Sequence, residues 1–288
     1  AQGLLARQID MANDAWDDNS ALSEEAAKRY ETTASQLRML RNQVVDLGIQ
    51  LGEKALPVLN ALIDLGAAAS NVASKEVAPQ TEIERLAPVV EALHAGGKKV
   101  SVDTFSTKVQ SWALSQNVAY LNDIQGFPDA KIYPELAESN AKLIVMHSVQ
   151  GRGRATEIDV PPQDILDRIL RFFERRIHAL TAAGIARERI ILDPGMGFFL
   201  GSNPETSLTV LRNLPKIKET FGMKILVGVS RKSFLRKITK KQFPTASLAA
   251  TLAAELFAAE NKADYIRTHN TDALFDALTV LRAATGQA

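Results

Sequence analysis

The chain has no cysteine among its 288 residues, and this absence excludes several kinds of site. Disulfide bonds, thiolate zinc sites and a cysteine nucleophile are all impossible. The chain also lacks a large net charge. Its 34 Lys and Arg residues are balanced by 33 Asp and Glu residues, which leaves a formal net charge of +1. A balance so close to zero gives no reason to expect a nucleic acid or an anionic membrane as a partner.

Long apolar runs are also missing. No stretch approaches the ~20 apolar residues of a membrane-spanning helix. Residues 1–20 carry several acids and no apolar core, so we expect no signal peptide and a cytoplasmic protein. The hydrophobic share of 46% and the charged share of 23% are those of a globular domain.

From residue 57 onward, short β-rich runs alternate with longer amphipathic stretches. The seven expected strands lie at residues 61–66, 98–104, 118–124, 141–148, 189–195, 223–230 and 263–269. Strands that are apolar on both faces and separated by helices indicate a parallel sheet. Seven strand–helix units favour an α/β fold of the TIM type, a (β/α)₈ barrel. An open, doubly wound sheet is the alternative.

The beginning of the chain follows another pattern. Residues 21–51 carry apolar side chains at helical spacing and contain no convincing strand. We therefore predict an N-terminal helical segment over residues 1–56 and a barrel domain over residues 57–288.

Polar side chains gather where the expected strands end. Because the carboxyl ends of parallel strands meet at one rim of a barrel, these side chains are candidates for a common site. A lone Asp after a strand is more often a helix cap, and a lone His is more often structural. Recurrence at one rim favours a ligand instead. Asp103, Asn122 and Asp193 can accept from the donor-rich edge of a flat heterocycle, and Arg267 with His269 offers an anion clamp.

Six motifs, in order along the chain, carry a resemblance to a known family. They are VSVDT, LNDIQGFPD, VMHS, ILDPGMGFF, VSRKSFL and DYIRTH. Together they resemble dihydropteroate synthase, and most of all its sulfonamide-resistant Sul type. The resemblance implies a transferase of folate biosynthesis that condenses p-aminobenzoate with 6-hydroxymethyl-7,8-dihydropterin diphosphate. It also implies Mg²⁺ as cofactor, insensitivity to sulfonamides and a homodimer, with no nucleic-acid or membrane partner.

The resemblance further implies roles for individual residues. The expected catalytic group is Lys232, Arg267 and His269, of which the last two would hold the departing diphosphate. The expected substrate-binding residues are Asp103, Asn122, Met146, Asp193, Phe198, Ser233, Phe127, Ser70 and Asn71. Lys232 would also bind the pterin, Met146 would lie against its face, and Ser233 would receive the p-aminobenzoate carboxylate. Phe127 would narrow the pocket against sulfonamides, or else simply pack beneath its loop. The metal ligands are unknown.

The chain departs from the family at its beginning. The family opens with a strand of the form G-I-x-N-x-T-P-D-S-F, whose Asn contributes to the magnesium and diphosphate site, and no such motif occurs here. Residues 21–62 instead resemble part of a phage tail tape-measure protein. Set against the family, strand 1 of the barrel is then missing or replaced by the helical segment 1–56, which is foreign to the family. We expect residues 43–57 to pack over the gap as helix. Three alternatives therefore stay open, namely a catalytically impaired pterin-binding barrel, a pterin-dependent methyltransferase and a phage-derived structural fusion. Methyl transfer needs no anion clamp, so the SRKSF and RTH motifs argue against it.

Overall fold

The computed structural model describes residues 78–150, 159–241 and 247–286. The chain divides into two compact units, Ala1–Lys98 and Lys99–Ala288. The first unit contributes helix α3 (Pro79–Ala95) to the description. The predicted helical segment 1–56, the packing of residues 43–57, the expected strand 61–66, and Ser70 and Asn71 all lie outside the described residues.

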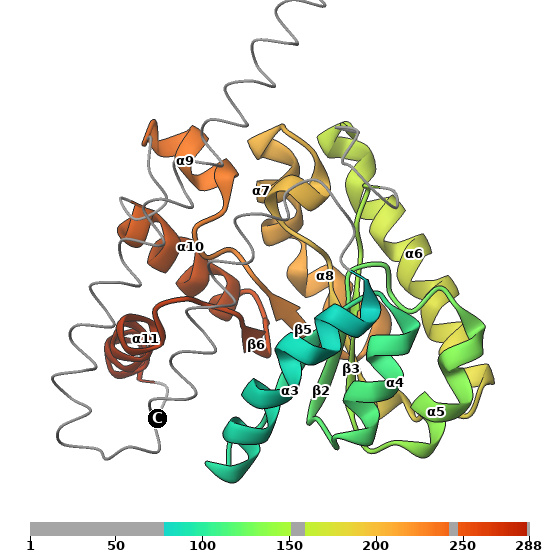
Figure 1. The fold of residues 1–288 in the computed structure, drawn as a ribbon. Helices are drawn as coiled ribbons and strands as arrows, with labels where there is room; N and C mark the ends of the chain where they lie inside the picture. The colour runs from blue at the N-terminus through green and yellow to red at the C-terminus, as the bar shows by residue number, and fades with distance from the viewer. Residues whose placement is uncertain (1–77, 151–158, 242–246, 287–288) are drawn as a thin grey trace, which may run out of the picture. The chain divides into compact units, whose positions relative to one another are not determined.

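The second unit is built on six parallel strands (Figure 1). They are β1 (Ser101–Asp103), β2 (Tyr120–Asp123), β3 (Lys142–Met146), β4 (Ile190–Asp193), β5 (Lys224–Val227) and β6 (Tyr265–Ile266). Each strand falls within one of the predicted runs and pairs in parallel with the next strand along the chain. A doubly wound sheet reverses its strand order at a switch point, whereas the wall of a barrel does not. The TIM-type prediction is therefore confirmed.

Helices follow the strands and cover the sheet. They are α4 (Thr107–Ser115), α5 (Tyr133–Glu138), α6 (Pro162–Ala182), α7 (Pro204–Arg212), α8 (Leu214–Phe221), α9 (Ser233–Thr239), α10 (Leu248–Glu260) and α11 (Thr271–Thr285). Short 3₁₀ turns are η1 (Ala130–Ile132), η2 (Arg187–Arg189) and η3 (Gly197–Leu200). Figure 1 shows α4, α5 and α6 near β2 and β3, with α9, α10 and α11 towards β5 and β6.

Helix α6 shows why these segments are helical. Ile165, Ile169, Phe173 and Ile177 recur every four residues and are all buried, which gives the helix one apolar stripe for the core. The strands have no such stripe, since Leu143 and Ile144, adjacent in β3, are both buried. Burial on both faces is what a parallel sheet between a barrel interior and a helical layer requires.

The turn after β2 is held in an unusual conformation. Gly126 and Phe127 both have positive φ, at 70° and 58°. The Asp123 carboxylate accepts the backbone N–H groups of Gln125 (2.7 Å) and Phe127 (3.1 Å), and the Tyr133 hydroxyl donates to the Phe127 carbonyl (2.9 Å). The Phe127 ring is 1% exposed. Burial of the ring outweighs the ~1–2 kcal/mol that a left-handed non-glycine residue costs.

Substitution of Phe127 by Gly tests this balance. Relief of the left-handed backbone would gain about 1 kcal/mol, but loss of the buried ring costs about 3–5 kcal/mol. We expect Phe127→Gly to lower the free energy of unfolding by about 2–4 kcal/mol in urea titrations. Lys240→Gly is the matched control, because Lys240 also has positive φ but is exposed. That control should be neutral or slightly stabilising. A more stable Phe127→Gly variant would show that strain dominates.

Candidate active site

A hollow of about 500 Å³ opens at the carboxyl ends of the strands. Its lining residues are Asp103, Ile124, Met146, Asp193, Met196, Phe199, Gly228, Ser230, Arg231, Lys232, Arg267, Thr268 and His269. Ile144, Ile191 and Leu226 form a buried apolar cluster on β3, β4 and β5, the strands that end at this hollow. Met146 and Asp193 come two residues later in β3 and β4, and Gly228 comes two residues after Leu226, directly beyond the end of β5. Successive residues on one face of a strand are two apart. The hollow therefore lies directly above this cluster.

Asp193 is the most deeply buried acid of the hollow, with 5% of the residue exposed. Burial raises the pKa of its carboxyl from 3.8 to about 6, although the Gly195 N–H, Lys232 and Arg267 all act to lower it. The Gly195 N–H donates to Asp193 Oδ1 at 2.8 Å. Asp193 thus ends its strand as a hydrogen-bond acceptor with very little water around it.

Lys232 faces the same space. Burial lowers the pKa of its ammonium group, and the Asp193 carboxylate opposes this effect. Its Nζ lies 4.8 Å from the centre of the Phe199 ring, within the range of a cation–π contact. A Cβ at Gly197 would stand 3.3 Å from the Lys232 stem. The glycine therefore lets the loop after β4 approach the lysine closely.

His147 supports this loop from outside the hollow. Its backbone N–H donates to the Asp193 carbonyl at 2.8 Å, and its Nδ1 lies 3.2 Å from the Pro194 carbonyl oxygen. Burial lowers the pKa of the ring to about 4. A Cβ on Gly195 would come within 2.3 Å of the His147 carbonyl oxygen, so glycine is required there. His147 is neutral and structural.

Cationic groups gather after β5 and β6. The guanidinium of Arg267 forms an ion pair with the Asp103 carboxylate at 3.0 Å. His269 follows closely, and burial first, then Arg231, Arg267 and Lys232, lower the pKa of its ring. The predicted pair of Arg267 and His269 is thus brought together at the wall of the hollow.

Asn122 is buried on β2 beside Asp103 of β1, and it does not line the hollow itself. It is 2% exposed, and neither its amide nitrogen nor its amide oxygen finds a hydrogen bond among the described residues. It pairs in register with Asp103 on β1. A buried amide without partners is costly, and such groups are rare in folded proteins. This amide is therefore available to a ligand.

The remaining predicted residues take other places. Phe198 is 43% exposed and does not line the hollow, whereas its neighbour Phe199 does. Ser233 is the first residue of α9. Phe127 lies under its turn, while Ile124 of that turn reaches the hollow. The buried Phe127 favours the packing alternative over direct narrowing of the pocket.

Sequence reasoning assigned no role to several lining residues, namely Ile124, Met196, Phe199, Gly228, Ser230, Arg231 and Thr268. Ser230 and Arg231 stand beside Lys232 in the VSRKSFL motif, so their adjacency was a usable signal. No comparable signal distinguishes Phe199 from Phe198, because only the backbone of η3 decides which ring turns inward.

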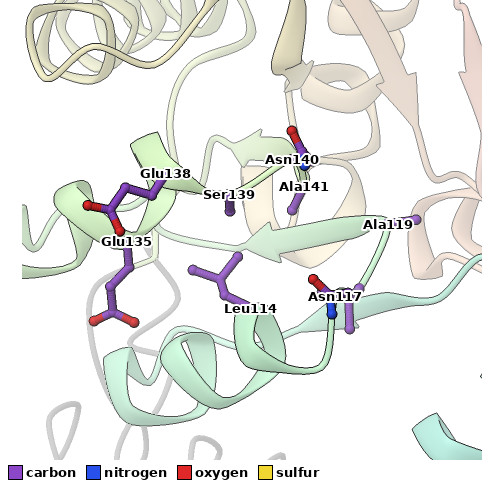
Figure 2. A pocket seen from close by; sticks show the side chains of 9 residues that line it. Leu114, Asn117, Ala119, Glu135, Glu138, Ser139, Asn140 and Ala141 are labelled. Carbon is purple, nitrogen blue, oxygen red and sulfur yellow. The ribbon is translucent and has the colours of Figure 1, made fainter.

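A second hollow, of about 400 Å³, lies at the opposite ends of β2 and β3. Figure 2 shows Asn117 and Leu114 at the end of α4, and Glu135 and Glu138 on α5. These side chains lie before the strands begin, whereas the ends of the strands carry the groups described above. The second hollow therefore shares no lining residue with the first.

The described residues do not form a metal site. No group of three or more His, Cys, Asp or Glu side chains is gathered there. Asp103 is paired with Arg267, and Asp193 is buried beside Lys232. The described part of the chain therefore offers no ready magnesium cage. Nor does any described helix have the length and apolar character needed to cross a membrane.

Comparisons with known proteins point in one direction. The model of the pterin binding enzyme family matches residues 25–269. A dihydropteroate synthase type-3 of Escherichia coli is 52% identical over 222 residues, which cover 77% of this chain and 84% of the relative. A dihydropteroate synthase type-2 of the same species is 52% identical over 238 residues, covering 83% and 87%.

Solved structures agree. Dihydropteroate synthase of Burkholderia cenocepacia has a TM-score of 0.67 at 32% identity, covering 74% of this chain and 81% of that one. The enzyme of Xanthomonas albilineans in complex with 7,8-dihydropteroate has a TM-score of 0.65 at 31% identity, covering 73% and 78%. The family match begins at residue 25, inside the segment that we predict to be foreign, and the boundary at residue 56 stays a prediction.

Asp193→Asn should stabilise the protein without ligand. Because the pKa of Asp193 is about 6 in the folded state and 3.8 otherwise, the fold binds its proton more tightly than the unfolded chain does. Its contribution to stability is therefore lost as the pH rises from about 4 to about 6. At neutral pH, Asn should raise the free energy of unfolding by about 1–3 kcal/mol.

The gain should stay below the full value, because Lys232 loses a neighbouring negative charge. Thermal melts at about pH 7.5 and about pH 4 test the prediction. The variant should have a higher melting temperature than the wild type only at about pH 7.5. Equal melting temperatures at the higher pH would mean that the buried carboxylate does not destabilise the fold.

Proposed function

Because the chain belongs to the pterin binding enzymes and, among them, to the dihydropteroate synthases, we propose that it joins p-aminobenzoate to 6-hydroxymethyl-7,8-dihydropterin diphosphate. One observation supports this most directly. The polar groups of the site divide into a largely buried set (Asp193, Asn122 and Lys232) and a cationic set (Arg267 and Arg231), with His269 beside the cationic set as a further hydrogen-bond donor. A neutral heterocycle that carries an anionic group needs these two sets side by side.

The buried set is suited to the pterin. A carboxylate accepts from ring N–H and amino groups, an ammonium donates to a ring carbonyl, and an amide does both. Asp193 and Lys232 are already largely removed from water before the ligand binds, as the raised pKa of Asp193 and the lowered pKa of Lys232 indicate. Asn122 gains its first partners when the pterin binds. Met146 lies between Asn122 and Asp193 in the strand order and would pack against the face of the ring.

The cationic set is suited to the leaving group. In the reaction, the bond between the pterin methylene and the diphosphate oxygen breaks, and the methylene forms a bond with the amine of p-aminobenzoate. The electron-rich pterin supports positive charge on the methylene, so no protein nucleophile is needed. Arg267 and His269 stabilise the departing diphosphate. Arg267 donates to Asp103 through Nη1, and the other N–H groups of its guanidinium can meet the diphosphate.

Other parts of the proposal rest on the resemblance. Ser233 would receive the carboxylate of p-aminobenzoate at the start of α9, and Phe198 would border its ring. Ser70 and Asn71 would cover the substrates. A requirement for Mg²⁺, a homodimer and a cytoplasmic location belong to the same proposal, and no step above is assigned to the metal.

Release of diphosphate from the two substrates tests the function directly. We expect Arg267→Ala to weaken pterin diphosphate much more than 6-hydroxymethylpterin, because only the former carries the charge that Arg267 meets. Loss of a charge-assisted contact should weaken binding by ~10- to 100-fold. Calorimetry with both ligands measures the difference. Arg282→Ala, at an exposed arginine of α11, is the control and should change neither affinity. Equal losses for both ligands would place Arg267 outside the diphosphate site.

Sulfonamide insensitivity has a separate test at the turn after β2. Phe127 is buried, but it fixes the turn that brings Ile124 to the hollow. A fixed turn excludes a bulky competitor and spares the smaller substrate. Phe127→Gly should therefore lower the sulfonamide inhibition constant more than it changes the KM for p-aminobenzoate. If both constants move together, the turn plays no part in discrimination.

A further inference from the structure

Ser230 joins the ends of β5 and β6 through one hydroxyl. The residue is 4% exposed. Its Oγ accepts the backbone N–H of His269 at 3.2 Å and lies 2.9 Å from Nδ1 of the same histidine. The resemblance assigns a role to His269 but none to Ser230. Two contacts with one residue make Ser230 a candidate for controlling the ring.

A count of hydrogens decides which way the second contact runs. A serine hydroxyl has one hydrogen to donate and two lone pairs to accept with. The backbone N–H of His269 occupies one lone pair, and no other acceptor for the hydroxyl hydrogen lies among the described residues. If Nδ1 carried a hydrogen, the hydroxyl hydrogen of the buried Ser230 would have no acceptor among the described residues, which is unfavourable. The arrangement that satisfies every group has Ser230 donating to a bare Nδ1.

We propose that Ser230 is a positioning residue that fixes neutral His269 as the Nε2–H tautomer, so that the uncharged ring donates a hydrogen bond to the diphosphate. This inference rests on the proposed function, because it takes diphosphate as the anion. Nε2 is the ring nitrogen left for a ligand, since Nδ1 is engaged and His269 lines the hollow.

The surroundings of His269 explain the value of a neutral donor. Arg231, Arg267 and Lys232 are the cations around it, and together with burial they lower the pKa of the ring. The acids that line the same hollow are Asp103 and Asp193. Asp103 is already paired with Arg267, and Asp193 lies beside Lys232. A ring that is hard to protonate can still donate, provided that its hydrogen is on Nε2.

His147 serves as an internal reference, because its ring should be the opposite tautomer. Its Nδ1 lies 3.2 Å from the Pro194 carbonyl oxygen. A carbonyl can only accept, so Nδ1 of His147 carries the hydrogen. The chain has four histidines, and two of them should therefore show opposite tautomers in the same spectrum.

Nitrogen-15 NMR of the labelled full chain reads the tautomers directly. At about pH 8, where neutral histidine prevails, His269 should show hydrogen on Nε2 and His147 hydrogen on Nδ1. The signals of His269 are assigned by their loss in His269→Asn. Ser230→Ala should convert His269 to a mixture and leave His147 unchanged, and Ser230→Thr should restore the wild-type pattern. Hydrogen on Nδ1 of His269 in the wild type would overturn the proposal.

Binding of inorganic pyrophosphate tests whether the tautomer of His269 affects the affinity for the anion. At about pH 8, Ser230→Ala should bind it ~10-fold more weakly than the wild type, because the neutral ring can turn a bare nitrogen towards the anion. At a pH low enough for nitrogen-15 NMR to show the His269 ring protonated, both nitrogens carry hydrogen, so the ratio between the two proteins should approach one. Ionisation of pyrophosphate affects both proteins equally and cancels in the ratio.

The outcomes separate the two proposals. A ratio that is the same with the His269 ring neutral and with the ring protonated would mean that Ser230 only supports the fold of the clamp, and would overturn the inference. Failure of the wild type to bind pyrophosphate would contradict the diphosphate clamp of the proposed function. In that case the NMR result still decides whether Ser230 sets the tautomer.

Discussion

Parallel pairing in chain order is the constraint on which the rest of the structure depends. Because each strand pairs with the next and all run the same way, residues more than 160 positions apart meet at one rim. The period of two along each strand then fixes which side chains enter the hollow. Ile144, Ile191 and Leu226 face inward as apolar core, and the next inward positions are Met146, Asp193 and Gly228. The chemistry begins where the apolar pattern stops.

Two buried polar residues of the site lower the stability of the fold when no ligand is bound. Asp193 is a carboxyl held where its charge is poorly solvated, and the side-chain amide of Asn122 finds no hydrogen-bond partner in the described part of the chain. A chain selected for stability alone would place apolar residues at both positions. The cost becomes useful when a ligand supplies the missing hydrogen bonds, because groups that are already desolvated bind a polar ring more tightly.

The sequence predicted the strands well, because each is a short apolar run bounded by turn residues, as "AKLIVMHS" shows around β3. It also predicted which strand ends carry polar groups, since Asp103, Asn122 and Asp193 interrupt apolar runs abruptly. It could not predict side-chain direction within irregular segments. Phe198 and Phe199 are identical in type, and only the geometry of η3 turns the second ring inward. Phe127 was equally ambiguous, because its burial depends on a left-handed turn that Asp123 and Tyr133 stabilise from elsewhere in the chain.

The ion pair of Arg267 and Asp103 connects the carboxyl end of β6 with that of β1. These are the last and the first strands of the described sheet. Asp103 therefore competes with any anionic ligand for the same guanidinium. Ionic strength then acts in two opposite directions. Salt screens the attraction between Arg267 and an anion, but it also screens the attraction of Arg267 to Asp103 and the repulsion between Asp103 and the anion. The observed affinity for anions should depend on salt less steeply than the number of cations in the hollow would suggest.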